Sequence, residues 1–273
     1  MLRMILYPLL FVLGVVVYVR YLERATVFQP TKVVLSTPKE VGVDYEDVYF
    51  PSLDNSRLHG WFIPAESRPE DAPVVIFLHG NAGNIGDRLE KILMFHNMGC
   101  GVFIVDYRRY GNSEGYPTEE GMYEDVQAAY DTLLARKDIR RDKVIVYGAS
   151  LGGAAAVDLS TRREVDALIL DSTFTSAADM GKNMFPFIPS FFLKVKLDSA
   201  RKIQGCRMPK LFIHSTDDKT VPFALGQKLF ERAPDPKAFL KITGDHNDGH
   251  VISERTYIGG ITAFLRQYGL LKT

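Results

Sequence analysis

The chain has no excess of charge of either sign, because its 33 Lys and Arg residues balance its 33 Asp and Glu residues. It also has no basic run and no zinc-finger spacing, so nothing in it indicates a nucleic-acid partner. Only two cysteines are present, Cys100 and Cys206, and neither lies in a CxxC or metal-ligand spacing. We therefore expect two isolated thiols in or near the core and no bound metal.

Internal repeats and low-complexity segments are absent as well, and the composition is that of a folded protein. The chain has 273 residues, of which 46% are hydrophobic. That length and that apolar fraction suit one large domain with a full core.

The longest uncharged apolar stretch is at the N-terminus, over residues 4–19, between Arg3 and Arg20. It falls short of the roughly 20 residues of a comfortable membrane span. Tyr21 and Leu22 extend it if the Arg20 side chain reaches back to the interface. A cleaved signal peptide is the alternative, but its apolar core is usually about 7–15 residues and a small-x-small cleavage site follows it. A buried helix of a soluble domain is the least favoured interpretation.

We therefore predict a single-pass transmembrane anchor over residues 1–25 that is not cleaved, and a folded domain over residues 26–273. The predicted location is a membrane. Positive charge flanks both ends of the apolar stretch, so the sequence does not set the side on which the domain lies.

The pattern of apolar residues changes along the folded domain. Alternation of polar and apolar residues predicts two antiparallel strands joined by a turn, at 44–51 and 58–63. Beyond them, short apolar strands are expected at 74–78, 101–105, 144–147, 165–170, 210–214 and 238–242, with helices at 88–97, 118–136 and 252–268. This alternation predicts an α/β fold, in which helices on both faces cover a mostly parallel central sheet. In such folds the ligand binds at the carboxyl ends of the strands.

One insertion, residues 173–208, interrupts the alternation and is rich in aromatic side chains, namely Phe174, Phe185, Phe187, Phe191 and Phe192. One interpretation is a short cap that packs these rings onto the domain. The other is a lid whose rings line an acyl pocket, and the two are compatible.

The segment Gly148-Ala149-Ser150-Leu151-Gly152 has the pattern Gly-x-Ser-x-Gly. It follows the expected strand at 144–147 and precedes a run of small, helix-forming residues. A strand, a tight turn with serine at its tip and a helix form the arrangement of a nucleophile elbow. The flanking glycines are expected because the strained turn leaves no room for Cβ atoms. Ser150 is therefore the candidate nucleophile.

A serine nucleophile needs a base within hydrogen-bond reach. In this architecture the acid and the histidine follow the serine, which leaves His214, His246 and His250. His214 ends a strand and precedes the favoured acid, so a structural role is expected for it. His246 lies in a polar loop after the last strand, from which an imidazole can reach the serine. His250 is the alternative base.

The base in turn needs an acid that holds its tautomer. Asp218 is favoured, because it lies after a strand in an Asp-x-x-Val-Pro sequence. Its neighbour Asp217 is expected to brace the turn, which is the usual role of aspartate there. Asp171 also follows a strand and is a third candidate.

An oxyanion hole needs two backbone N–H groups. One is that of Leu151, directly after the nucleophile. The other is expected in the loop after the strand at 74–78, where Gly80 lets the backbone approach the substrate and Asn81 is the candidate donor. His79 is expected to brace this loop, because it precedes the nucleophile.

These motifs together resemble the α/β-hydrolase family over residues 28–268. His-Gly-Asn-Ala-Gly-Asn at 79–84, Gly-x-Ser-x-Gly at 148–152 and Gly-x-His-Asn-Asp at 244–248 are most similar to a membrane-anchored group within it. That group includes eukaryotic protein-depalmitoylating serine hydrolases and their uncharacterised bacterial relatives. Those eukaryotic enzymes rely on a cysteine-rich, lipidated N-terminus, which this sequence lacks, so protein depalmitoylation is not carried over.

The resemblance implies Ser150 as nucleophile, Asp218 as acid and His246 as base, with no metal and no cofactor. It implies a serine hydrolase that cleaves an ester or thioester of a small or lipid-like acyl substrate through an acyl-enzyme. A serine peptidase of the aminopeptidase type is an alternative on the same fold, and a non-catalytic binding module held at a membrane is another.

Residues 106–115 match the family's Asp-Tyr-Arg-Gly-Tyr-Gly-x-Ser-x-Gly loop except at Arg109, where glycine is usual. This departure bears on the backbone of the loop and on the rim of the pocket, and not on the proposed triad.

Overall fold

The central sheet has eight strands in the order β10-β9-β8-β7-β4-β6-β3-β2. The computed structural model describes residues 2–67 and 69–272. In this sheet β3 runs against both of its neighbours, whereas the strands from β6 to β10 pair in parallel. The strands are β2 (Glu46–Pro51), β3 (Arg57–Ile63), β4 (Val74–Leu78), β6 (Gly101–Asp106), β7 (Val144–Ala149), β8 (Ala167–Asp171), β9 (Lys210–Ser215) and β10 (Lys237–Ile242). The predicted hairpin and the mostly parallel sheet are therefore confirmed.

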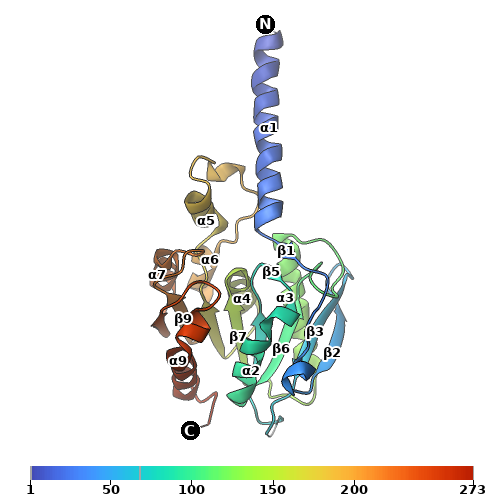
Figure 1. Ribbon diagram of the computed structural model, residues 1–273, viewed down its shortest axis with the longest axis vertical. Helices are drawn as coiled ribbons and strands as arrows, with labels where there is room; N and C mark the ends of the chain where they lie inside the picture. Colours follow the sequence, from blue (N-terminus) through green and yellow to red (C-terminus); the bar gives the residue numbers. More distant parts are fainter. Residues whose placement is uncertain (1, 68, 273) are drawn as a thin grey trace.

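Helices pack on both faces of this sheet, and α1 stands out from the body of the molecule (Figure 1). The helices are α1 (Leu2–Thr26), α2 (Leu89–Asn97), α3 (Glu119–Ala135), α4 (Leu151–Arg162), α5 (Ala177–Met184), α6 (Ser199–Lys202), α7 (Phe223–Arg232), α8 (Gly249–Ile252) and α9 (Glu254–Gln267). The cap insertion at 173–208 contains α5, α6 and two short 3₁₀ turns. Helix α7 is present but was not predicted from the sequence.

Strand β4 contributes side chains to the hydrophobic cores on both faces of the sheet. Its residues Val74, Ile76 and Leu78 join the cluster that packs on α3 and α4. Val75 and Phe77, on the opposite face, join the cluster that packs on α2 and α9. Because successive side chains of a strand point to opposite faces, a strand covered on both sides must be apolar throughout. This is why the unbroken apolar run predicts β4 with its observed bounds.

Both cysteines lie in these cores. Cys100 and Cys206 are buried and free, as expected from their isolation in the sequence. Burial raises the pKa of the Cys100 thiol to about 12 and that of the Cys206 thiol to about 11. Neither is therefore a thiolate near neutral pH.

The helix expected at 252–268 is present as α9, and the short helix α8 precedes it after a break. The break falls at Ser253, between α8 and α9. The Ser253 hydroxyl accepts a hydrogen bond from the Thr243 N–H at 2.9 Å and donates one to the Thr243 carbonyl at 3.0 Å. A serine side chain that bonds to a distant backbone in this way favours a helix boundary over a helix interior.

Helix α1 occupies the segment that was predicted to be a membrane anchor. Residue 1 and the side chains of residues 2–5, 8, 9 and 24, which belong to the predicted anchor, lie outside the part of the chain that the structure describes. Among the described residues, no helix combines the length and the apolarity that crossing a bilayer requires. The predicted transmembrane helix is therefore not supported. Its last turns also carry the charged residues Arg20 and Glu23, which shorten the apolar stretch.

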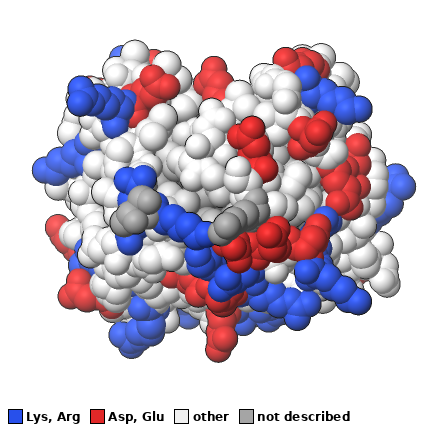
Figure 2. Space-filling model, turned by 90° about the horizontal axis from the view of Figure 1, so that it is seen from below, with Lys and Arg blue, Asp and Glu red and all other residues white. Residues whose placement is uncertain are grey.

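The end of the molecule opposite α1 carries charges of both signs. Figure 2 shows Lys and Arg side chains beside Asp and Glu side chains over much of this face. Elsewhere on the chain, charges pair over short distances, as Arg140 does with Asp142 and Arg163 with Asp131. This mixture agrees with the formal net charge of zero.

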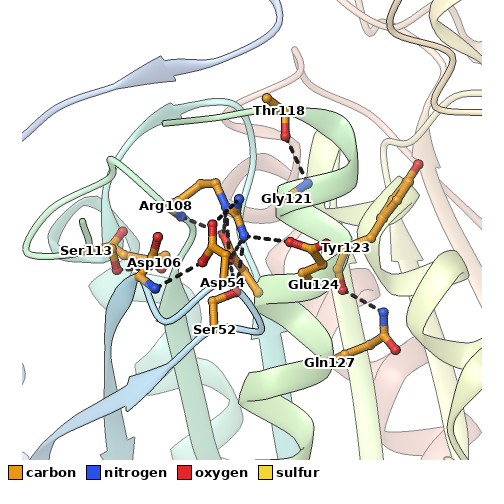
Figure 3. Close-up of polar contacts among 12 residues, drawn as sticks. Ser52, Asp54, Asp106, Arg108, Ser113, Thr118, Gly121, Tyr123, Glu124 and Gln127 are labelled. Atoms are coloured by element: carbon orange, nitrogen blue, oxygen red, sulfur yellow. Dashed lines mark hydrogen bonds and ion pairs between the residues drawn. The ribbon is translucent and has the colours of Figure 1, made fainter. Parts of the chain in front are cut away.

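A buried arginine fixes the loop after β6, as Figure 3 shows. The Arg108 side chain donates to Asp125 of α3 at 2.8 Å and to Asp54, in the β2–β3 turn, at 3.1 Å. Its backbone N–H also donates to Asp125, at 2.8 Å. Because Asp125 further accepts from the Ser52 hydroxyl at 2.8 Å, the hairpin, the loop and α3 are joined in one network. Charge-assisted hydrogen bonds of this kind are stronger than neutral ones.

Arg109, next to this network, has a φ of +72°. This is the left-handed region, which glycine adopts freely and other residues adopt at a cost. At the position where the family's loop usually has glycine, this chain thus has a backbone conformation that favours glycine, and an exposed arginine adopts it.

We expect Arg109→Gly to be more stable than Arg109→Ala by about 1 kcal/mol, because only alanine has to hold a Cβ at this φ. The exposed residue Gln227, in the middle of α7, offers a control, since there alanine should exceed glycine by about 1 kcal/mol. Urea denaturation of the four variants measures the free energies of unfolding. A more stable alanine variant at both positions would contradict the account.

Candidate active site

Ser150 lies at the tip of a tight turn between β7 and α4. Its φ is +52° and its ψ is −115°, a conformation that L-residues rarely adopt. The turn is held on both sides, since the Ser150 N–H donates to the Asp171 carbonyl at 2.8 Å and the Ser150 carbonyl accepts from the Thr173 hydroxyl at 2.8 Å. Strained residues of this kind persist only where the surroundings fix them, and they gather at functional sites.

The two flanking glycines are required for steric reasons. A Cβ on Gly148 would lie 2.5 Å from the Gly152 carbonyl oxygen. A Cβ on Gly152 would lie 2.0 Å from the Leu78 carbonyl oxygen, at the end of β4. The expectation that the turn leaves no room for Cβ atoms is therefore confirmed. The close approach also places the start of α4 against the loop that follows β4.

Three loops at the carboxyl edge of the sheet bring Ser150, His246 and Asp218 together. His246 Nε2 lies 3.1 Å from Ser150 Oγ, and His246 Nδ1 lies 2.7 Å from Asp218 Oδ2. A carboxylate oxygen only accepts, so Nδ1 carries the proton of this hydrogen bond. In the neutral imidazole Nε2 is then free to accept the serine proton.

Asp218 is buried and its carboxylate is fixed by its own loop. Asp218 Oδ1 accepts from the backbone N–H groups of Thr220 at 2.9 Å and Val221 at 2.8 Å. The Val221 carbonyl in turn accepts from His214 Nε2 at 2.9 Å. Burial lowers the pKa of His214. His214 therefore braces the loop that carries the aspartate, in the structural role expected for it.

The alternative acid and base candidates lie apart from this arrangement. Asp217 is exposed and accepts from the Gly244 N–H at 3.3 Å, so it braces a loop as expected. The Asp171 carboxylate accepts from Lys91 Nζ at 2.6 Å and from the Tyr257 hydroxyl at 2.6 Å. His250 Nε2 lies 3.3 Å from a Glu90 carboxylate oxygen.

The buried ion pair of Asp171 and Lys91 is a part of the site that sequence reasoning missed. Burial alone would raise the pKa of Asp171, but the Lys91 ammonium and hydrogen bonds from Tyr147 and Tyr257 hold it well below its ordinary value. The Asp171 carboxylate is therefore charged, and both of its oxygens already accept hydrogen bonds. The residues of this cluster come from two helices and two strands. Because they are distant in sequence, no local sequence pattern predicts the cluster.

The two predicted oxyanion donors belong to segments that adjoin Ser150, the start of α4 and the loop after β4. Leu151 is the first residue of α4, so its N–H has no partner within the helix. In the loop after β4, a Cβ on Gly80 would lie 3.7 Å from Ser150 Cβ. His79 Nδ1 donates to the Gly80 carbonyl at 2.7 Å. The Gly80 carbonyl and the Asn81 N–H belong to the same trans peptide group and point in opposite directions. The hydrogen bond from His79 to the Gly80 carbonyl therefore directs the Asn81 N–H away from the His79 ring.

The chain that follows α1 holds this loop in place. Strand β1 (Gln29–Pro30) pairs in parallel with β5 (Ala82–Gly83). The Gln29 N–H donates to the Asn81 carbonyl at 2.9 Å, and the Asn81 side-chain amide donates to the Thr26 carbonyl at 3.0 Å. The last residue of α1 is thus hydrogen-bonded to a residue beside the nucleophile.

A cavity of about 800 Å³ opens beside Ser150 and His246. The volume is within the range of small-molecule sites. Most of the cap side chains that line it are apolar, among them Phe174, Met180, Phe185, Leu193, Val195 and Leu197. Of the aromatic residues of the insertion, Phe174 and Phe185 therefore line the cavity, whereas Phe187 and Phe191 are largely exposed. Among the described residues, no group of three His, Cys, Asp or Glu side chains could hold a metal ion.

Comparison with known sequences finds relatives along most of the chain. Residues 69–204 match the family described as serine aminopeptidase, S33. The alpha/beta hydrolase domain-containing protein WAV2 of Arabidopsis thaliana is 34% identical over 284 residues, which cover 94% of this chain and 91% of that protein. The uncharacterized protein Rv2307c of Mycobacterium tuberculosis is 32% identical over 262 residues, covering 94% of this chain and 92% of its own.

Solved structures show the same fold at low sequence identity. The esterase Pf2001 of Pyrococcus furiosus superposes with a TM-score of 0.74 and 21% identity, covering 88% of this chain and 98% of that one. The acylaminoacyl peptidase of Pyrococcus horikoshii has a TM-score of 0.62 and 19% identity, covering 86% of this chain and 43% of that one.

Two helical glycines test the steric account of the turn. We expect Gly152→Ala to lower the free energy of unfolding by about 3 kcal/mol, because the new Cβ would overlap the Leu78 carbonyl. A Cβ on Gly259 of α9 would meet no atom within 4 Å. Gly259→Ala should therefore raise the free energy of unfolding by about 1 kcal/mol. Urea denaturation measures the free energy of unfolding of both variants. Equal effects of the two substitutions would contradict the steric account of the turn.

Proposed function

The chain belongs to the α/β-hydrolase family, and on that premise we propose that it is a serine hydrolase that cleaves an ester or thioester through an acyl-enzyme. The observation that carries the proposal is the hydrogen-bonded series from Ser150 through His246 to Asp218, at 3.1 and 2.7 Å. A nucleophile, a base and an orienting acid within these distances form the arrangement of a catalytic triad.

In the proposed reaction, His246 Nε2 takes the hydroxyl proton as Ser150 Oγ attacks the carbonyl carbon of the substrate. The Leu151 and Asn81 N–H groups stabilise the oxyanion of the tetrahedral intermediate. Asp218 keeps the imidazole in its tautomer and stabilises the imidazolium. The proton on Nε2 then passes to the leaving group, and water releases the acyl group by the same route.

The lining of the cavity supports an ester or thioester over a peptide. A peptidase that acts on a free N-terminus needs an uncompensated negative charge for the substrate ammonium. Four acidic side chains line the cavity, namely Glu23, Asp87, Glu90 and Asp171. Glu23 and Asp171 are within ion-pair distance of Arg20 and Lys91, whereas Glu90 faces His250, whose pKa burial lowers. The apolar cap side chains suit an acyl chain. The ester is therefore favoured by the apolar cap and not by a lack of negative charge.

A serine peptidase remains the second candidate, because the matching family is described as serine aminopeptidase. The two are separated by comparing hydrolysis of acyl esters and thioesters with that of amino-acid amides by the purified chain. We expect turnover of the acyl esters. Turnover of the amides alone would establish the peptidase.

Fluorophosphonate labelling tests whether the chain is catalytic at all. We expect wild type to be labelled on Ser150 and Ser150→Ala to be unlabelled. A wild type that fails to label would favour a non-catalytic binding module.

Two neighbouring aspartates provide a matched test of the acid. We expect Asp218→Asn to lower kcat for an ester substrate by a factor of about 10⁴, because the amide no longer fixes the imidazole tautomer. Asp217→Asn should stay close to wild type, because the exposed Asp217 carboxylate only braces a loop. Steady-state kinetics of both variants measures the difference. Equal losses in the two variants would refute the assignment of Asp218.

A further inference from the structure

The segment that returns from the cap to the domain is held by two buried glutamates. Glu23 Oε1, on α1, accepts from the backbone N–H groups of Lys194 at 2.7 Å and Val195 at 2.9 Å. Glu119, at the start of α3, accepts from the next two N–H groups, those of Lys196 at 2.6 Å and Leu197 at 2.9 Å. Four successive peptide groups are thus bound to carboxylates from two distant helices.

These carboxylates are themselves fixed. Glu23 is only 7% exposed, and its second oxygen accepts from Arg20 Nη1 at 2.6 Å. Glu119 is 9% exposed and also accepts from the Tyr123 hydroxyl at 2.9 Å. Hydrogen bonds from N–H groups to a carboxylate are stronger than neutral ones, and loss of one partner leaves a buried polar group unpaired. Both clamps therefore determine where the segment lies.

The clamped segment forms one wall of the cavity beside Ser150. Leu193, Val195 and Leu197 all line it. Leu197 has a φ of +44°, a left-handed conformation that leucine adopts only under constraint. The segment is thus held against its own backbone preference, and the clamps supply that constraint.

Helix α1, which contacts this segment through Glu23, contributes a further part of the wall. Val19 and Leu22 line the same cavity, and Val19 is almost fully buried. Figure 1 shows the cap helix α5 beside the lower end of α1, with the rest of α1 extending away from the domain. The last turns of α1 are therefore part of the cavity.

We propose that the end of α1 and the clamped segment 193–197 form an acyl channel, and that Glu23 is the positioning residue that sets its width. The substrate class is esters or thioesters of medium to long unbranched acyl chains. This deepens the proposed function and rests on it. Each methylene buried in such a channel raises kcat/KM about fourfold, until the channel is full.

The experiment compares p-nitrophenyl esters from butanoate to hexadecanoate in the full-length chain. In wild type we expect kcat/KM to rise with chain length. In Glu23→Ala and Glu119→Ala the ratio of kcat/KM for dodecanoate to that for butanoate should fall at least tenfold, mainly through KM. Glu23→Gln retains an oxygen that can accept both N–H groups, so it should recover part of the ratio. Glu120→Ala, next to the clamp but exposed, should keep the wild-type ratio.

A second variant covers the case in which loss of a buried carboxylate unfolds the domain. Leu22 is only partly buried, so Leu22→Trp can be accommodated while it narrows the channel. It should shift the optimum to shorter chains. A wild-type chain-length profile in Leu22→Trp, or an unchanged ratio in folded Glu23→Ala, would overturn the channel.

Failure of the proposed function has a different signature. In that case wild type would neither hydrolyse any ester nor react with a small fluorophosphonate. A wild type that reacts and hydrolyses, but prefers the shortest ester, would overturn the acyl channel and leave the serine hydrolase standing.

Discussion

The left-handed turn at Ser150 is the constraint on which the rest of the site depends. A residue at a φ of +52° costs on the order of 1–3 kcal/mol, which the surrounding packing must offset. Gly152 permits that packing, because α4 can then approach the carbonyl of Leu78. The same approach brings the loop after β4 beside the serine. One close contact thus positions the nucleophile and the proposed oxyanion donor Asn81 together.

The sequence was most informative where a local pattern has one physical solution. An unbroken apolar run predicts β4, and Gly-x-Ser-x-Gly between a strand and a helix predicts the turn. Asp218 and His246 could be chosen because they follow strands in the order that the architecture requires. The same reasoning could not exclude Asp171, which also ends a strand. Two contacts remove it from the choice, its own with Lys91, from a helix distant in sequence, and that of His246 with Asp218.

The N-terminal helix has a contact that sequence reasoning did not predict. Its apolar run predicts a membrane anchor, which the described residues do not support. Its last turns contact the cap through Glu23. That contact involves the backbone N–H groups of Lys194 and Val195, so the side chains of the partner segment carry no signal of it. The one acidic residue of this helix, Glu23, is the only trace of this role in the sequence.

The most direct test of the central claim is a crystal structure of the chain inhibited by a dodecyl fluorophosphonate. The account predicts phosphorus bonded to Ser150 Oγ and the phosphoryl oxygen within hydrogen-bond distance of the Leu151 and Asn81 N–H groups. It also predicts the dodecyl chain between α1 and segment 193–197. Phosphorus bonded to another residue, or an alkyl chain directed into solvent, would contradict it.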